Sequence, residues 1–210
     1  GHSWPGVVGR AGSGHGGGTK CHLALVGFMI TFANWDLRDL RLASTLNLRT
    51  CSEDFDLSDL SNPIQHISNH CVQLESDQYG TQEQGNELFT EEFLEVLEQK
   101  HPGHGEQRLM ELMDQMRYIV IHTVASIREV VGGVDYDCFQ LLGYDFMIDE
   151  DMKVWLLEVN GSPACASRLL DRFAADVVKI IIDPLISPQS GLEQSTQGTL
   201  FDHLPLPKSL

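Results

Sequence analysis

The sequence predicts an α+β fold in which helices pack on one face of a mostly antiparallel sheet. Near the C-terminus, two apolar segments, 139–149 (FQLLGYDFMID) and 153–163 (KVWLLEVNGSP), are joined by an acidic turn, as in a β-hairpin. Two long segments, 86–100 and 106–131, carry apolar residues at helical spacing, and a third follows at 166–182. This combination of a hairpin and packed helices is typical of an α+β lobe.

The N-terminal segment supplies little of this fold. Residues 1–20 are rich in glycine, so we expect them to be disordered. Their string GSGHGGGTK lacks the GK[ST] ending of a phosphate-binding P-loop and any preceding strand, so it indicates a tail. The run CHLALVGFMITFA (21–33) is apolar but short and follows glycines instead of basic residues. We expect a buried strand there, or a segment outside the fold, rather than a targeting signal.

Three helices are predicted. The first begins at Asn86 and turns its apolar residues to one face and its glutamates to solvent. The segment HPGHG (101–105) ends it, and a second helix runs from about Glu106 until Gly132 and Gly133. The Met-rich stripe of this second helix indicates core packing rather than a binding groove. The apolar faces comprise Phe89, Phe93, Val96 and Leu97 in the first helix, and Leu109, Leu112, Met113, Met116, Val120, Val124 and Ile127 in the second.

The third helix is expected to span residues 166–182 and to end before Pro184. The polar tail after Pro188 should have little fixed structure. The residues expected to be buried by this helix are Leu169, Leu170, Phe173, Val177 and Ile181.

Composition excludes several classes of function. The chain has 14 Lys and Arg against 30 Asp and Glu, a formal net charge of −16, which disfavours nucleic acid and anionic membranes as partners. No segment approaches the roughly 20 apolar residues that span a bilayer. Five widely spaced cysteines without a CxxC pair suit a reducing compartment, so we expect a cytoplasmic protein. His66 and His70 lie four apart but lack the HExxH glutamate, which disfavours a zinc site.

The predicted hairpin carries oxygen ligands suited to a hard cation. Side chains alternate along a strand, so Glu158 and Asn160 face one way, while Trp155, Leu157 and Val159 face the other. Asp145 joins them if the turn sets the register that pairs it with Leu156. Such ligands suit Mg²⁺, which substrate phosphates usually complete, and so favour a nucleotide. The alternative is an acidic hairpin whose polar residues merely face water. The apolar strand around Glu158 disfavours this alternative, because an unpaired carboxylate in such surroundings is costly.

Several segments resemble the tubulin tyrosine ligase family. They are LNLRTCSEDF (46–55), HISNHCVQ (66–73), GNELFTEEF (85–93), FQLLGYDFMIDEDMKVWLLEVNGSPACA (139–166) and the helix that follows. The run EVNGSPACA is the most specific. The resemblance implies the C-terminal lobe of an ATP-grasp fold and a cytoskeleton-associated ligase. This ligase would add free tyrosine to the C-terminal glutamate of detyrosinated α-tubulin in the tubulin heterodimer, through an acyl phosphate.

The resemblance also implies roles for particular residues. Asp145, Glu158 and Asn160 would hold Mg²⁺ between the phosphates of ATP, and K⁺ is a further ion that the family would admit. Ser68 and Asn69 match a Thr-Asn pair that lines the nucleotide pocket. Arg49 would meet a phosphate or a carboxylate, as the planar fork of arginine does well.

The departures from the family define the expected domains. Residues 1–40 do not resemble it, residues 41–188 form the partial ATP-grasp lobe, and residues 189–210 form a tail. The central lobe with its nucleotide-binding lysines does not precede this lobe, so we expect little ligation by this chain alone. Arg38, Arg41 and Arg49 could meet a carboxylate of the acidic tubulin tail, but we expect the basic tubulin-binding surface to lie largely in the missing portion. The alternative function is a truncated, non-catalytic module that binds tubulin or another protein.

Overall fold

The fold is described from a computed structural model that covers residues 22–30, 45–56, 58–81, 83–131, 140–149, 151–163 and 166–182. The predicted N-terminal and C-terminal tails lie outside these residues. The chain divides into two compact units. The first comprises Gly1–Val26, Leu46–Leu112 and Asp145–Leu157; the second comprises Gly27–Thr45, Met113–Tyr144 and Glu158–Leu210.

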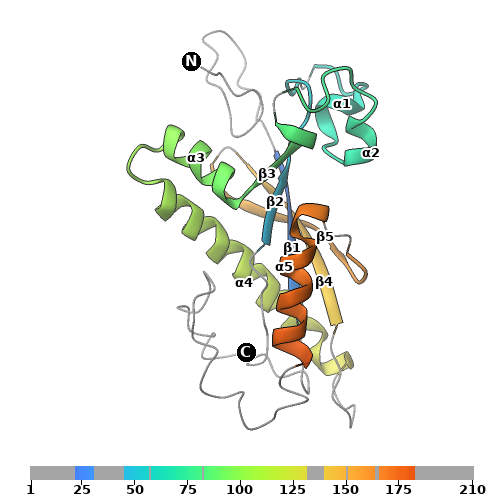
Figure 1. The fold of residues 1–210 in the computed structure, drawn as a ribbon, viewed down its shortest axis with the longest axis vertical. Coiled ribbons are helices and arrows are strands. Elements are labelled where there is room, and N and C mark those ends of the chain that lie inside the picture. Colours follow the sequence, from blue (N-terminus) through green and yellow to red (C-terminus); the bar gives the residue numbers. More distant parts are fainter. Residues whose placement is uncertain are drawn as a thin grey trace. The chain divides into compact units, whose positions relative to one another are not determined.

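Five strands are described, in the order β3-β2-β1-β4-β5 (Figure 1). They are β1 (His22–Ile30), β2 (Thr45–Arg49), β3 (Glu87–Phe89), β4 (Gln140–Ile148) and β5 (Val154–Asn160). The strand predicted within 21–33 is confirmed by β1. The two strands of the predicted hairpin are confirmed by β4 and β5, which neighbour each other in the sheet.

Helices and strands are mixed along the chain, and β2 pairs antiparallel with β3, which supports the α+β class; the ATP-grasp assignment stays a prediction. The helical segments are α1 (Pro63–His66), α2 (His70–Gln73), η2 (Gln84–Asn86), α3 (Thr90–Lys100), α4 (Gly105–Val131), η3 (Ser167–Leu169), α5 (Leu170–Val177) and η4 (Val178–Ile182). The bounds of α4 agree with the predicted second helix. The third is continuous in extent but changes from a 3₁₀ turn to an α-helix and then to a π-helical end.

The predicted start of the first helix at Asn86 is wrong. Residues Glu87–Phe89 form β3, which pairs antiparallel with β2 so that Arg49 lies opposite Glu87 and Asn47 opposite Phe89. Asn86 has a φ of 53°, which a right-handed helix does not admit. The strand pairing therefore overrides the local helical pattern. The helix begins at Thr90, where the Glu92 carboxylate accepts the N–H of Phe89 at 2.7 Å.

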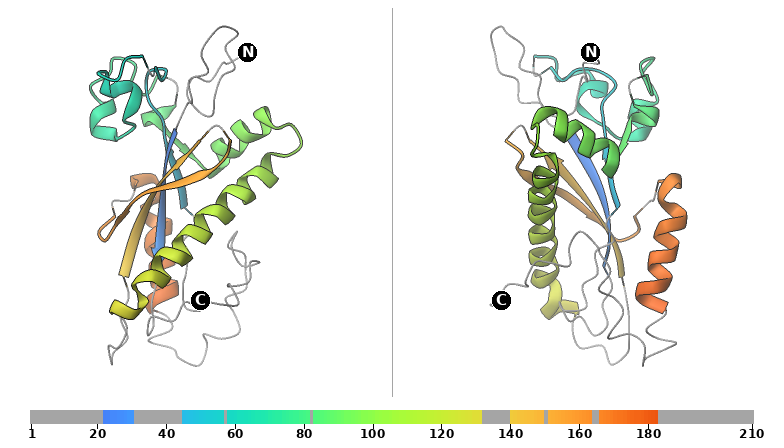
Figure 2. Two further views of the ribbon diagram at one scale, coloured as in Figure 1. Left: turned by 180° about the vertical axis from the view of Figure 1, so that it is seen from behind. Right: turned by 60° about the vertical axis from the view of Figure 1, so that its left-hand side comes forward.

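A short turn at 101–104 joins α3 to the beginning of α4 (Figure 2). The Glu98 carboxylate accepts the N–H of Gly103 at 2.5 Å and that of Gly105 at 2.9 Å. Gly103 has a φ of 76°, and a Cβ on Gly105 would lie 2.8 Å from the backbone nitrogen of Glu98. The turn therefore needs glycine at both places, once for the backbone conformation and once for the close approach.

Each unit has its own buried apolar residues. In the first they are Leu46, Leu48, Leu88, Phe89, Phe93, Val96, Leu97, Leu109, Leu112, Phe146, Ile148 and Val154. In the second they include Met113, Met116, Val120, Ile121, Val124 and Tyr144. The predicted core faces of the first two helices are thus confirmed up to Val124. The prediction for Ile127 is wrong, because this part of α4 extends beyond its last buried residue and leaves that side chain 40% exposed.

The third helix is packed less deeply than predicted. Leu169, Phe173 and Val177 are half-buried, but Leu170 is 52% exposed. Leu170 lies at the edge of the apolar stripe and in the first turn of α5, so its predicted burial is wrong. Separately, none of the helices in the described part of the chain is long and apolar enough to cross a bilayer.

The Met-rich stripe of α4 offers a matched test of this packing. Met116 is fully buried, whereas Met110 on the same helix is 55% exposed. We expect Met116→Ala to lower the free energy of unfolding by about 2–5 kcal/mol, because it removes buried methylenes and leaves a cavity. Met110→Ala should change it by less than about 0.5 kcal/mol. Urea denaturation of both variants measures the difference, and equal effects would contradict the assignment of the stripe to the core.

Candidate functional site

The predicted site residues lie on three parts of the chain. Arg49 ends β2, Ser68 and Asn69 lie in the loop between α1 and α2, and the predicted cation ligands lie on β4 and β5. The first unit contains Arg49, Ser68, Asn69 and Asp145, and the second contains Glu158 and Asn160. The structure brings together groups within each unit. That Asp145 shares one ion with the other two ligands stays a prediction.

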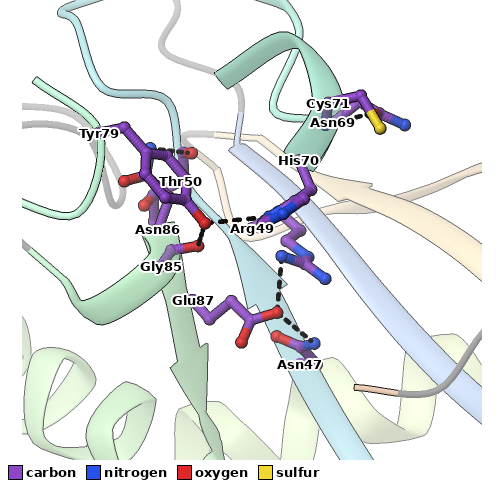
Figure 3. Close-up of polar contacts among 10 residues, drawn as sticks. All are labelled: Asn47, Arg49, Thr50, Asn69, His70, Cys71, Tyr79, Gly85, Asn86 and Glu87. Carbon is purple, nitrogen blue, oxygen red and sulfur yellow. Dashed lines mark hydrogen bonds and ion pairs between the residues drawn. The ribbon is translucent and has the colours of Figure 1, made fainter. Parts of the chain in front are cut away.

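Arg49 meets a carboxylate from its own chain. Its guanidinium lies 2.6 Å from the Glu87 carboxylate, directly across the β2–β3 pair (Figure 3). Asn47 donates to the same carboxylate oxygen at 3.4 Å. Both charged side chains are mostly covered, with 17% of Arg49 and 20% of Glu87 exposed. Glu87 was not among the predicted site residues.

The loop between α1 and α2 holds Ser68 in a buried position. Ser68 is only 4% exposed, and its hydroxyl has no hydrogen-bond partner among the described residues. Asn69 is exposed and caps α2, because its side-chain oxygen accepts the N–H of Cys71 at 2.9 Å. Leaving a buried hydroxyl without a partner is unfavourable, so Ser68 has the chemistry to receive a ligand such as a nucleotide.

A buried amide network fixes this loop against the end of β2. The Asn86 side-chain nitrogen lies within hydrogen-bond distance of three acceptors: Thr50 O at 3.1 Å, Ser52 Oγ at 2.8 Å and Gln73 Oε1 at 3.3 Å. Its side-chain oxygen accepts the N–H of Gly80 at 2.8 Å. One side chain thus joins the strand end, α2 and the turn at Gly80.

Gln73 extends this network to the loop itself. It is fully buried, and it donates to the carbonyl oxygens of Ile64 at 2.9 Å and Ile67 at 2.6 Å. Its side-chain oxygen accepts the N–H of Ser52 at 2.6 Å. Because Ile67 directly precedes Ser68, Gln73 determines where the loop lies relative to the end of β2.

Tyr79 adds a second connection between α2 and the turn before β3. Its hydroxyl lies 3.0 Å from Nδ1 of His70 and donates to the carbonyl oxygen of Gly85 at 3.3 Å (Figure 3). His66, by contrast, belongs to α1 and contacts the carbonyl oxygen of Asp59 at 2.7 Å. The two histidines considered as a metal pair therefore lie on different helices with separate partners.

A buried carboxylate, that of Glu83, lies beside the network. Glu83 is 6% exposed and accepts the hydroxyl of Thr50 at 2.9 Å through one oxygen. Its other oxygen has no partner among the described residues. Burial raises the pKa of Glu83, and the hydrogen bond from Thr50 only partly opposes this effect.

The hairpin turn is fixed by Asp149. One carboxylate oxygen accepts the backbone N–H groups of Asp151 at 3.0 Å and Lys153 at 2.9 Å, and the other accepts the indole N–H of Trp155 at 2.8 Å. Burial alone would raise the pKa of Asp149, but these hydrogen bonds and the Lys153 charge lower it. The Lys153 ammonium lies 3.7 Å from the centre of the Trp155 ring. These contacts stabilise the turn that connects β4 to β5.

Glu158 and Asn160 point to the same side of β5, as predicted. The Asn160 side-chain nitrogen donates to the Glu158 carboxylate at 3.2 Å, which requires both groups on one face. Asp145 is a buried residue of β4. Among the described residues, no group of three or more His, Cys, Asp or Glu side chains could hold a metal. The predicted set has two carboxylates and one amide, oxygen donors whose chemistry fits Mg²⁺.

Sequence reasoning missed Asn86, Gln73 and Glu83. The dipeptide Gly85-Asn86 is a turn signal, and both residues have positive φ, 70° and 53°. That signal could have moved the predicted helix start towards Thr90. Nothing in the local sequence identifies Gln73 or Glu83, because Gln73 is joined to Ser52, 21 residues away, and Glu83 to Thr50, 33 residues away.

The protonation of Glu83 predicts a pH-dependent stability. A carboxyl whose pKa is raised on folding contributes most when protonated, and this contribution is lost as the pH rises above the ordinary value of 4.5 through the raised value. We expect Glu83→Gln to stabilise the chain relative to wild type increasingly from pH 4.5 upwards. Thermal unfolding of both proteins between pH 4 and 8 measures this, and a difference that does not vary with pH would contradict it.

Asn86 allows the network and the backbone to be tested separately. Asn86→Gly keeps the positive φ but removes the hydrogen bonds, and we expect it to lower the free energy of unfolding by about 2–3 kcal/mol. Asn86→Ala should cost about 1 kcal/mol more, because an alanine disfavours positive φ. Chemical denaturation of the two variants measures both terms. A glycine variant as stable as wild type would show that the network does not hold the loop.

Comparison with known proteins identifies the family to which this chain is similar. The model of the "Tubulin-tyrosine ligase family" matches residues 44–194, which confirms the resemblance found in the sequence. The "Probable tubulin polyglutamylase TTLL9" of Bos taurus is 36% identical over 110 residues, 52% of this chain and 23% of that protein. The "Probable alpha-tubulin polyglutamylase Ttll1" of Tetrahymena thermophila is 26% identical over 165 residues, 73% of this chain and 39% of that protein.

"Tubulin glycylase 3F" of Tetrahymena thermophila is 29% identical over 121 residues, 58% of this chain and 13% of that protein. The chain thus spans less than half the length of each of these three relatives. Their names specify polyglutamylation or glycylation of tubulin. None of the three names specifies tyrosine as the added amino acid.

Proposed function

Because the chain belongs to the tubulin-tyrosine ligase family, we propose that it forms part of an ATP- and Mg²⁺-dependent ligase that attaches an amino acid to tubulin. The match of the family model over residues 44–194 carries this proposal. We further propose tyrosine as the amino acid and the C-terminal glutamate of detyrosinated α-tubulin as the acceptor, on the resemblance of EVNGSPACA (158–166). The reaction would take place in the cytoplasm, in association with the cytoskeleton.

The proposed chemistry has two steps. The acceptor carboxylate oxygen attacks the γ-phosphorus of ATP, ADP leaves, and an acyl phosphate forms. The amino group of the incoming amino acid then attacks the acyl carbon, phosphate leaves, an amide bond forms, and the nitrogen loses a proton. Such a reaction asks the protein mainly for positioning and for neutralisation of charge.

The residues of the chain have chemistry suited to these tasks. Asp145, Glu158 and Asn160 would hold Mg²⁺, which neutralises the negative charge of the phosphates when bound. The buried hydroxyl of Ser68 supports a role in the nucleotide pocket, since it has no partner among the described residues. Asn69 uses its side-chain oxygen to cap α2 and so retains its amide N–H groups to donate to a ligand. Arg49 would bind a substrate carboxylate.

The identity of the amino acid is the point that needs measurement first. In the full natural polypeptide that carries this chain, labelled tyrosine, glutamate and glycine should be supplied separately with ATP, Mg²⁺ and detyrosinated tubulin. We expect incorporation of tyrosine. Incorporation of glutamate or glycine instead would support the proposed ligase activity and contradict tyrosine as its substrate. Tubulin binding without incorporation of any of the three would overturn the ligase and favour a non-catalytic interaction module.

Glu158 provides the test of the metal ligands. Glu158→Gln keeps the shape of the side chain but removes one negative charge, so we expect kcat/KM for ligation to fall at least about 100-fold. Asp151→Asn, which removes a charge from the exposed hairpin turn, is the matched control and should retain activity. Rates are measured in the full natural polypeptide at several Mg²⁺ concentrations. Equal activity of the two variants would exclude Glu158 as a ligand.

A further inference from the structure

A small group of complementary polar side chains lies on one face of the β2–β3 pair. Asn47 and Arg49 are two residues apart on β2 and therefore face the same side, and Glu87 lies opposite Arg49 on β3. The three side chains meet at a single atom, Oε1 of Glu87, which contacts Arg49 at 2.6 Å and Asn47 at 3.4 Å (Figure 3). We call this group the Arg49–Glu87 cluster.

The cluster has polar atoms that these contacts do not use. The ion pair engages one terminal nitrogen of Arg49, although a guanidinium has five N–H donors in a planar fork. Glu87 uses one carboxylate oxygen for both contacts and has a second oxygen able to accept. An anion-binding group and a cation-binding group therefore lie side by side, and each is still partly exposed, 17% and 20%.

Asn47 provides an independent indication of a ligand. It is 4% exposed, and its side-chain oxygen has no partner among the described residues. The oxygen and nitrogen of an amide are assigned from their surroundings. Whichever way this amide is turned, one of its polar atoms lacks a partner in the described part of the chain. A purely structural ion pair does not need a buried amide with an unmade hydrogen bond beside it.

The charge of the cluster selects among ligands. Because Glu87 neutralises Arg49 at 2.6 Å, the pair offers no net positive charge to a phosphate or to an acidic peptide. A ligand that carries one negative and one positive group meets both members at once. An α-amino acid in its zwitterionic form has this charge pattern within a few bonds.

We propose that Asn47, Arg49 and Glu87 form a recognition site for the backbone of a free α-amino acid. Arg49 binds the α-carboxylate through its remaining N–H donors, Glu87 accepts from the α-ammonium group, and Asn47 completes the contacts of the ammonium group. This inference rests on the proposed ligase, in which an amino acid is the second substrate, and it adds Glu87 and Asn47 as residues that determine substrate class. No bond is made or broken at this site.

The test compares ligands that differ in one charged group. Saturation-transfer NMR on the full chain uses L-tyrosine, glycine and L-glutamate, together with N-acetyl-L-tyrosine, which lacks the ammonium, and L-tyrosine amide, which lacks the carboxylate. We expect the wild-type protein to bind at least one free amino acid and to bind both derivatives of tyrosine more weakly. No binding of any of the three amino acids, or equal binding of derivatives and parent, would overturn the site.

Glu87→Gln separates recognition from folding. The glutamine keeps an oxygen that can accept from Arg49, so the strand pair should persist, and thermal unfolding checks this. We expect free amino acids to bind about tenfold more weakly, and N-acetyl-L-tyrosine to bind as well as before or better, because the repulsion of its carboxylate is removed. Glu91→Gln, an exposed residue of α3, is the control for net charge and should bind like wild type. Equal weakening of every ligand would indicate a structural role and contradict the proposal.

Asn47→Leu gives a second and independent readout. The Asn47 oxygen has no partner among the described residues and its nitrogen makes only the long contact to Glu87, so the substitution should change the stability of the chain little. Binding of the free amino acid should nevertheless fall several-fold; unchanged binding would remove Asn47 from the site.

Two outcomes distinguish this inference from the proposed function. If the full natural polypeptide ligates an amino acid but Glu87→Gln leaves the KM for that amino acid unchanged, the site is wrong and the ligase stands. If the chain binds amino acids and responds to Glu87→Gln but no ligation occurs, the site stands and the ligase is wrong.

Discussion

The first unit depends on the buried hydrogen bonds of Asn86. This residue has a positive φ of 53° and is only 3% exposed, and its amide joins groups from three segments. The backbone conformation turns the chain out of η2 so that residues 87–89 run antiparallel to β2. Glu87 is thereby set opposite Arg49, and α3 cannot begin before Thr90. A change at Asn86 would therefore move the ion pair as well as the turn.

The same network couples two of the predicted functional elements. Gln73 accepts from Ser52 and donates to the carbonyl oxygen of Ile67, next to Ser68. The loop that carries Ser68 and the end of β2 that carries Arg49 thus share buried hydrogen-bond partners. Neither segment can shift without breaking these buried hydrogen bonds, which water cannot replace. Such coupling would keep a nucleotide and a second substrate in constant relation, which phosphoryl and acyl transfer require.

The sequence predicted what local periodicity determines. The bounds of α4 and the two strands of the hairpin followed from patterns within each segment, and these are the features that local packing controls. The common face of Glu158 and Asn160 followed from the alternation of a strand. What the sequence did not predict depends on distant partners: Asn47 and Glu87 are 40 residues apart, and Asn86 and Ser52 are 34 apart. The start of α3 was mispredicted for this reason, since β2 decides the conformation of residues 87–89.

The overall charge of the chain bears on which ligand Arg49 receives. With 30 acidic and 14 basic residues, most of the surface repels an acidic peptide, and the guanidinium of Arg49 is already neutralised by Glu87. A free amino acid has no net charge when its side chain is neutral, so its binding does not require a basic surface. It requires one donor group and one acceptor group at short range, and the β2–β3 pair supplies both. The charge balance around Arg49 therefore disfavours binding of the acidic tubulin tail there. It is compatible with binding of the free amino acid that would be joined to that tail.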